Sequence, residues 1–148
     1  MPAHSDKYHS SHSAKELFDI VADVEKYPEF LPWVTATRIT ERFEKHFVAD
    51  MVVNFKGLTQ KYTSKVDLIT DKNFPEIDVG LVKGPFKHLK THWIFEPAEK
   101  GTNIIFELDF KFQSAVLEKM IGYFFEKAVG RMTDAFIKRA DDLLGTST

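Results

Sequence analysis

Apolar residues recur along the chain at two different spacings, and the change of spacing marks the secondary structure. In the first part they recur at helical spacing, at Leu17, Ile20, Val21 and Val24. Ser13, followed three residues later by Glu16, forms the capping-box pattern with which helices begin. Pro28 and Pro32 prevent further helix, so the sequence predicts an amphipathic helix of about three turns after Ser13.

Apolar and polar residues then alternate from residue 34 to residue 112, as in strands that are buried on one face. Residues with turn chemistry interrupt the alternation and predict strands at 34–42, 46–56, 58–69, 76–83, 87–97 and 102–112. The last strand would place five apolar side chains on one face: Ile104, Phe106, Leu108, Phe110 and Phe112. The middle of the chain is therefore predicted to be an antiparallel meander with one buried and one solvated face.

Helical spacing returns at Ser114 and continues without a proline to Leu144, which predicts a helix about 46 Å long. Its apolar stripe consists of Leu117, Met120, Ile121, Phe124, Ala128, Met132, Phe136 and Leu143. We therefore expect one α+β domain over residues 1–148, in which a curved antiparallel sheet of six to seven strands wraps around this helix. Such a sheet presents more apolar surface than one helix covers, so an apolar cavity is expected between them.

The composition narrows the classes of function. The 148 residues include 14 phenylalanines, which either fill the core or line a cavity. The absence of cysteine excludes disulfides, thiol nucleophiles and thiolate metal sites. The formal net charge of −2 argues against DNA as a partner, although a local basic patch is compatible with it. No window approaches about eighteen uninterrupted apolar residues, and residues 1–10 lack the apolar core of a signal peptide.

Residues that commonly carry chemistry form no convincing catalytic or metal-binding group. His88 and His92 would lie about 13 Å apart on a strand, which is too far for both to bind one metal ion. Glu107 and Asp109 share the solvated face of the last strand, where a solvated pair is favoured over acid–base catalysis. Catalysis would depend on isolated polar residues of the cavity, such as Gln60, Tyr62 and Ser64. We therefore expect no enzymatic activity, catalytic cofactor or metal.

Five separated segments resemble one known family, and the similarity extends over nearly the whole chain, from about Ser13 to Leu144. They are EKYPEFLPW (25–33), NFKGLTQKYTSKV (54–66), KGPFKHLKTHWIFEP (83–97), FELDFKFQSAVLEKM (106–120) and GRMTDAFIKRA (130–140). In this order they resemble the coenzyme Q-binding protein family of START-like (polyketide cyclase/lipid transport) domains, whose bacterial members include ribosome association toxin A. Val34, where relatives often have Cys, and Lys65, where Arg is commoner, depart from the family pattern.

The resemblance implies a helix-grip fold whose cavity holds ubiquinone or a related polyisoprenoid lipid, with no established enzymatic reaction. The predicted ligand-binding residues come from the segment after the first helix, from the sheet and from the C-terminal helix. They are Phe30, Leu31, Trp33, Met51, Val53, Phe55, Tyr62, Leu81, Phe86, Trp93, Phe95, Phe106, Leu108, Phe110, Leu117, Met120, Ile121, Phe124, Ala128 and Met132.

The resemblance implies that the segment EKYPEFLPW lies beside the mouth of the cavity. Its apolar side chains would either gate the entry of a lipid tail or plug the end of the core. These side chains are Tyr27, Phe30, Leu31, Pro32 and Trp33.

The segment KGPFKHLK (83–90) combines a turn, an aromatic ring and lysines. The Gly84–Pro85 turn would hold Phe86 at its tip, where the surrounding lysines face anionic lipid or ribosomal RNA phosphates. The alternatives are a plain solvated hairpin and a Phe86 ring folded back over the cavity. The lysines are Lys83, Lys87 and Lys90.

Three functions are compatible with these observations. The first is a quinone chaperone or carrier that supports respiratory electron transport, with the membrane or respiratory enzymes as peripheral contacts. The second is a toxin-like factor that associates with the large ribosomal subunit and blocks subunit joining. The third, a cyclase or hydrolase, would need an acid–base pair that the sequence does not offer. Because the chain begins close to its first expected element, we expect a cytoplasmic protein at the periphery of the bacterial inner membrane. The alternative is a mitochondrial relative whose presequence has been removed.

Overall fold

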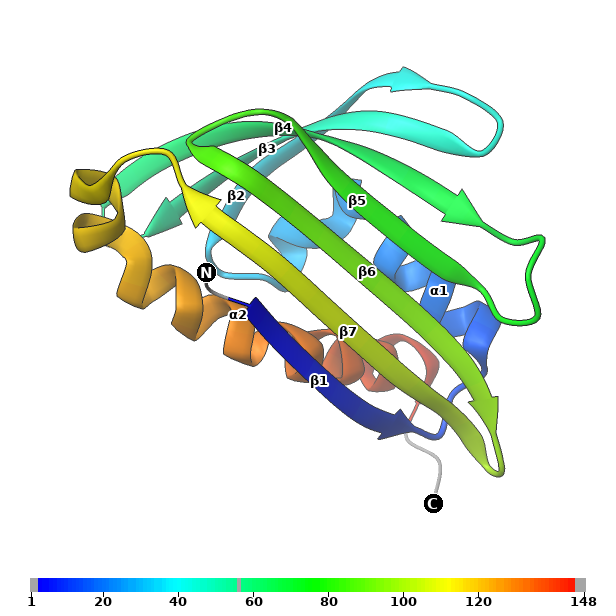
Figure 1. The fold of residues 1–148 in the computed structure, drawn as a ribbon. Helices are drawn as coiled ribbons and strands as arrows, with labels where there is room; N and C mark the ends of the chain where they lie inside the picture. Colours follow the sequence, from blue (N-terminus) through cyan, green and yellow to red (C-terminus); the bar gives the residue numbers. More distant parts are fainter. Residues whose placement is uncertain (1–2, 56, 146–148) are drawn as a thin grey trace.

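A seven-stranded antiparallel sheet curves around one long helix in the computed structural model, which describes residues 3–55 and 57–145 (Figure 1). In chain order the elements are β1 Ala3–Ser10, α1 Ala14–Ala22, the 3-10 helix η1 Val24–Glu29, β2 Val34–Arg42, β3 His46–Phe55, β4 Leu58–Ile69, β5 Glu76–Lys83, β6 Phe86–Ala98, β7 Gly101–Phe112 and α2 Ala115–Leu144. The strand order is β1-β7-β6-β5-β4-β3-β2. The predicted α+β fold, with a curved sheet around a C-terminal helix, is confirmed.

All six strands predicted from the alternation are present, with ends that differ by at most one residue. Residue 56, the predicted end of the second of them, lies outside the described residues. In β7 the five predicted apolar side chains are buried, while Glu107 and Asp109 between them are exposed. Burial of alternate side chains therefore fixes the face that each strand turns toward the helix.

The sequence pattern gives no signal for β1, which forms the edge of the sheet beside β7. Its residues AHSDKYHS are mostly polar, and hardly any of the side chains described there reach the core. Backbone pairing with β7 holds β1 in place, from Ala3 opposite Asp109 to Ser10 opposite Thr102. An edge strand that contributes main-chain hydrogen bonds leaves no apolar period in the sequence.

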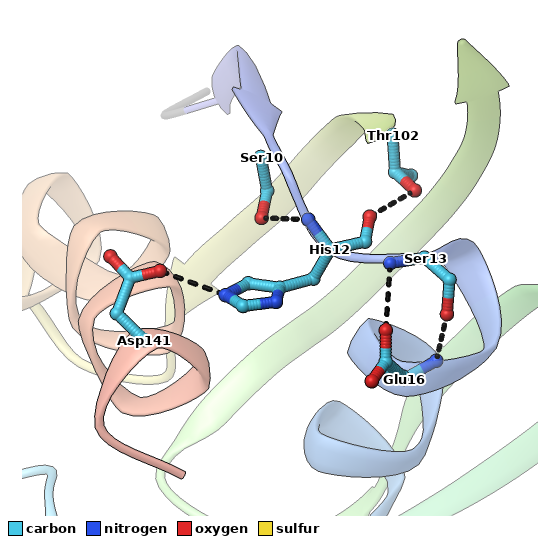
Figure 2. A network of polar contacts seen from close by, with 6 residues as sticks. All are labelled: Ser10, His12, Ser13, Glu16, Thr102 and Asp141. Atoms are coloured by element: carbon cyan, nitrogen blue, oxygen red, sulfur yellow. Dashed lines mark hydrogen bonds and ion pairs between the residues drawn. The ribbon is translucent and has the colours of Figure 1, made fainter. Parts of the chain in front are cut away.

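The first helix begins as predicted. Ser13 Oγ accepts a hydrogen bond from the backbone N–H of Glu16 at 3.2 Å, and the Glu16 carboxylate accepts one from the backbone N–H of Ser13 at 3.0 Å (Figure 2). This reciprocal pair satisfies two N–H groups that the first turn leaves free. The α-helix ends at Ala22, and the chain continues as η1, which contains Pro28.

The second helix lies across the open side of the curved sheet (Figure 1). Ser114 caps it, and its Oγ accepts from the backbone N–H of Leu117 at 3.0 Å. The residues that it buries are Ile121, Gly122, Phe125, Ala128, Val129, Thr133, Phe136 and Ala140.

The predicted apolar stripe of α2 is therefore partly wrong. Met120 and Leu143 are more than half exposed, and Phe124 is only half-buried, whereas its neighbour Phe125 is buried. The first half of α2 contains two rows of apolar residues with helical spacing. The rows are offset by one position in the sequence, so they point in directions about 100° apart around the helix axis. The row through Ile121 and Phe125 is buried, whereas on the other row Met120 is exposed and Phe124 is only partly buried.

A buried histidine joins the start of the fold to the last turns of α2 (Figure 2). His12 Nε2 lies 2.8 Å from Asp141 Oδ1, and His12 is only 7% exposed. Its backbone N–H donates to Ser10 Oγ at 3.2 Å, and its carbonyl accepts from the hydroxyl of Thr102 at 2.8 Å. One residue thus connects β1, β7 and α2 at the entrance to α1.

Replacing this histidine should destabilise the whole domain. We expect His12→Ala to lower the free energy of unfolding by about 1–3 kcal/mol, because Asp141 loses its partner and a buried ring is removed. Urea unfolding followed by circular dichroism measures this. The matched control is His88→Ala, which removes a partly exposed histidine 3.1 Å from the exposed Asp109 and should change stability by no more than about 0.5 kcal/mol. Equal losses in both variants would contradict a special role for His12.

Candidate ligand cavity

A cavity of about 110 Å³ lies between the concave face of the sheet, η1 and α2. Strands β3 to β7 supply most of its wall, and α1, the segment around η1 and the middle of α2 close it. The lining residues are Val21, Val24, Tyr27, Leu31, Trp33, Val34, Ala49, Met51, Val53, Phe55, Tyr62, Ser64, Val66, Ile77, Val79, Leu89, Thr91, Trp93, Phe106, Leu108, Phe125, Ala128, Val129, Met132 and Phe136. The cavity expected from a curved sheet that presents more apolar surface than one helix covers is therefore present.

The wall is apolar and carries no charge: among the described residues that line it there is no Asp, Glu, Lys, Arg or His. Besides the two indole rings, its polar groups are the hydroxyls of Tyr27, Tyr62, Ser64 and Thr91. The Tyr27 hydroxyl donates to the backbone carbonyl of Val21, and the Tyr62 hydroxyl donates to Met51 Sδ at 3.0 Å. Such a wall suits a neutral apolar molecule and disfavours an ion.

Aromatic contacts hold both ends of the cavity. At one end Trp93 lies 4.4 Å from Phe106 and 5.2 Å from Phe136, measured between ring centroids. At the other end Phe125 lies 4.6 Å from Phe110 and 5.8 Å from Phe55. Edge-to-face and tilted pairs of this kind contribute about 0.5–1.5 kcal/mol each beyond the burial of their surface, so contacts among the rings stabilise both groups.

The structure brings eleven of the twenty predicted ligand-binding residues to the cavity wall. These are Leu31, Trp33, Met51, Val53, Phe55, Tyr62, Trp93, Phe106, Leu108, Ala128 and Met132. The other nine do not line it: Phe30, Leu81, Phe86, Phe95, Phe110, Leu117, Met120, Ile121 and Phe124. These eleven residues are positioned to contact a ligand, and that they bind one stays a prediction.

Eight of these nine residues lie off the wall in one of three kinds of position, and the ninth, Phe86, is described in the next paragraph. Phe95, Phe110 and Ile121 are buried in core packing beyond the wall. Met120 points into solvent. The half-buried members pack against the core away from the cavity: Phe30, Leu81, Leu117 and Phe124.

Phe86 does not stand at the tip of its hairpin. Of the alternatives considered for this segment, the exposed ring is therefore contradicted, and the ring is instead folded inward, although it does not line the cavity. The ring is 6% exposed and packs against Tyr62, Phe112 and Phe125, with centroid distances of 5.9, 5.1 and 5.4 Å. Burying a ring of this size in the core is more favourable in free energy than exposing it to water at a turn. The lysines of the segment, in contrast, are exposed: Lys83, Lys87 and Lys90.

The apolar residues of the segment EKYPEFLPW do not share one position: some line the cavity and others lie outside it. Tyr27, Leu31 and Trp33 line the cavity. Phe30 lies outside it, 5.2 Å from the Phe136 ring and 5.0 Å below the Arg139 guanidinium, and Pro32 is exposed. Part of the segment is thus placed to contact a ligand, and Phe30 packs beneath a cation at the surface.

Fourteen wall residues were not among the predicted ligand-binding residues, and the strand alternation contained the signal for many of them. Ser64 and Val66 follow Tyr62 at steps of two on β4, and Thr91 precedes Trp93 by two on β6. Extending each alternating row to its end would have placed them on the wall. Phe125 required the correct rotation of α2, which the sequence leaves ambiguous.

The histidines of β6 lie on the outer face of the sheet. His92 Nε2 lies 2.8 Å from Glu76 Oε1, and its Nδ1 contacts Asp78. His88 pairs with Asp109 instead. Within residues 3–55 and 57–145 no three His, Asp or Glu side chains are placed to share a metal ion. In the same residues, no helix combines the length and apolar character needed to cross a bilayer.

A curved antiparallel sheet that grips a C-terminal helix around an apolar cavity is the helix-grip architecture of START-like domains. Residues 10–137 match the family described as polyketide cyclase / dehydrase and lipid transport, and the chain belongs to this family. Ribosome association toxin RatA of Rickettsia prowazekii (strain Madrid E) is 41% identical over 131 residues, which cover 88% of this chain and 90% of that protein. The mitochondrial coenzyme Q-binding protein COQ10 of Drosophila melanogaster is 28% identical over 137 residues, covering 86% and 53%. The predicted family resemblance is therefore confirmed.

Solved structures confirm the helix-grip fold. A START superfamily protein from Mycobacterium smegmatis matches with a TM-score of 0.78 at 20% identity, covering 95% of this chain and 98% of that one. The Zhui aromatase/cyclase from Streptomyces sp. R1128 matches with a TM-score of 0.82 at 17% identity, covering 95% and 93%. Because the fold serves an enzyme as well, it does not by itself decide between binding and catalysis.

The two cavity tyrosines should make the domain sensitive to alkali. Burial raises the pKa of both Tyr27 and Tyr62 above the ordinary 10.0. Above about pH 10 the unfolded chain loses these protons while the folded chain keeps them, so the free energy of unfolding falls as pH rises, by up to about 1.4 kcal/mol per pH unit for each group. Tyr62→Phe should therefore flatten this decline. Urea unfolding at about pH 9, 10 and 11 tests it, with the exposed Tyr123→Phe as control; identical slopes in both variants would contradict it.

Proposed function

We propose that the protein binds ubiquinone or another polyisoprenoid lipid in this cavity and acts as a carrier or chaperone that supports respiratory electron transport. The observation that carries the proposal is the uncharged apolar cavity between sheet and helix. The similarity to a coenzyme Q-binding protein supports the choice of ligand. Among the described residues of the same wall, no nucleophile is paired with a base, which favours binding over an enzymatic reaction. The carrier would work in the cytoplasm at the inner membrane.

The size of the cavity sets a condition on binding. At about 110 Å³ it is smaller than an engineered cavity of about 150 Å³ that admits benzene, so a quinone ring with its tail has to enlarge it. Met51 and Met132, both half-buried on the wall, are unbranched side chains that change shape at low cost. Each buried isoprene unit contributes about 4 kcal/mol, at about 0.8 kcal/mol per carbon, which offsets this rearrangement.

Filling the cavity should abolish binding. Ala128 lies on the wall, so Ala128→Trp would occupy the space of the ligand, and Ala128→Leu would occupy part of it. After expression in a quinone-producing host, organic extraction and mass spectrometry should find near-stoichiometric ubiquinone in the unmodified protein, less in Ala128→Leu and almost none in Ala128→Trp.

The matched control is Met120→Trp, which adds the same ring to the exposed face of the same helix and should keep the lipid. Circular dichroism of each variant verifies that it is folded. Lipid retained by a folded Ala128→Trp protein would show that the ligand binds elsewhere. A folded, unmodified protein without any lipid would count against the carrier function.

A second function is favoured by a different part of the molecule. Lys83, Lys87 and Lys90 are exposed while Phe86 between them is buried, which leaves a charged surface without an inserting ring. Such a surface fits RNA phosphates better than the apolar interior of a bilayer. Together with the similarity to RatA, this supports association with the large ribosomal subunit and interference with subunit joining.

Sedimentation of ribosomes tests this alternative. Added protein should lower the fraction of joined ribosomes, and replacing Lys83, Lys87 and Lys90 together by Gln should remove the effect, because their phosphate contacts supply the affinity. A control triple replacement of the exposed Lys7, Lys45 and Lys138 by Gln removes the same charge elsewhere and should leave the effect intact. Unchanged profiles with the unmodified protein would rule out this function.

A further inference from the structure

Ser64 is a polar residue of the cavity wall that the protein itself leaves unsatisfied. It is 6% exposed, and its Oγ is buried without a hydrogen-bond partner. A buried hydroxyl without a partner destabilises the folded state, so such groups concentrate where function requires them. In the described part of the chain, the hydroxyls of Thr37 and Thr133 are also buried and unpaired, but neither residue lines the cavity.

The residues that pair with Ser64 across the sheet offer no polar side chain. Ser64 pairs with Ala49 on β3 and with Leu81 on β5. These residues share the face of the sheet that Ser64 occupies, and both are apolar. A partner for the hydroxyl therefore has to come from the cavity.

Tyr62 supplies a second hydroxyl on the same strand face. It precedes Ser64 by two residues on β4, and both residues line the cavity. The Tyr62 hydroxyl donates to Met51 Sδ at 3.0 Å. A thioether is a weak acceptor, so an oxygen atom of a ligand would form a stronger hydrogen bond with this hydroxyl.

We propose that Ser64, together with Tyr62, forms a hydrogen-bonding subsite for one neutral oxygen atom of the bound molecule. The ligand class is then an apolar molecule that carries a carbonyl, ether or hydroxyl oxygen and places it against β4. Pure hydrocarbons leave Ser64 unpaired, and carboxylates or phosphates find no cation on the described wall. This inference rests on the proposed binding function and adds how the molecule is oriented.

Two ring compounds of nearly the same shape distinguish the contribution of the oxygen atoms to binding from that of the hydrocarbon. Duroquinone carries two carbonyl oxygens on a ring with four methyl groups, and durene carries the same methyl groups without oxygen. Trp33 and Trp93 both line the cavity, so quenching of tryptophan fluorescence reports duroquinone, and durene is measured by its displacement of duroquinone. We expect Ser64→Ala to weaken duroquinone binding about 3- to 10-fold and to leave durene binding unchanged. Tyr62→Phe should weaken duroquinone binding in the same direction.

Stability gives an independent readout of the same subsite. Without ligand, Ser64→Ala removes an unpaired buried hydroxyl and should raise the melting temperature by about 2–4 °C. Thr133→Val is the matched control, because it removes an unpaired buried hydroxyl of α2 that lies off the wall. It should raise the melting temperature similarly while the affinity for duroquinone stays the same. A gain of stability coupled to a loss of affinity is expected for Ser64 alone.

The outcomes separate this inference from the function on which it rests. If the unmodified protein retains extracted ubiquinone but Ser64→Ala binds duroquinone as tightly as before, the subsite is wrong and the carrier function stands. Equal weakening of duroquinone and durene would also overturn it, because the loss would then come from altered cavity shape. If the unmodified protein binds neither ring and holds no lipid, the carrier function fails and the subsite with it.

Discussion

The structure depends on one mismatch, between a curved apolar sheet and the single helix that covers it. Strands β3 to β7 of the antiparallel sheet turn most of its large inward side chains toward α2, and the helix offers one face in return. Close packing is reached at the two ends, where aromatic rings from β6, β7 and α2 meet. Between them the facing surfaces do not fill the space, and the cavity is what is left. Its position therefore follows from the architecture rather than from a dedicated loop.

The chemistry of the cavity follows from the same constraint. Strand residues that face inward alternate with residues that face water, so the charged side chains of β6 and β7 fall on the outer face. The inner wall keeps a few hydroxyls on an apolar surface. Neutral walls bind by burial of area, and selectivity then depends on the few groups able to form hydrogen bonds. A family that contains both lipid carriers and cyclases is understandable on this basis, since small changes of wall chemistry alter what a common shell does.

Much of the fold could be read from the sequence, because burial imposes a period on it. The alternation of β7 and the Ser13–Glu16 pair each report a local physical requirement, and both predictions are confirmed. β1 could not be found in this way, since backbone pairing to β7 needs no particular side chains. The rotation of α2 was also undetermined: Phe124 and Phe125 are equally apolar, and only contact with the sheet distinguishes them. About half of the candidate site could therefore be predicted from the sequence, and the position of the remaining residues depended on tertiary packing.

The order of the elements along the chain has a consequence for synthesis on the ribosome. Strand β1 emerges first but pairs with β7, so Ala3 waits for Asp109 before the edge of the sheet can close. The helix that covers the apolar face is made last, and His12 meets Asp141 only then. A nascent chain that already contains the meander thus exposes a broad row of phenylalanines with no cover of its own. During this interval the chain is most prone to aggregation and most dependent on chaperones, and the interval ends when α2 docks.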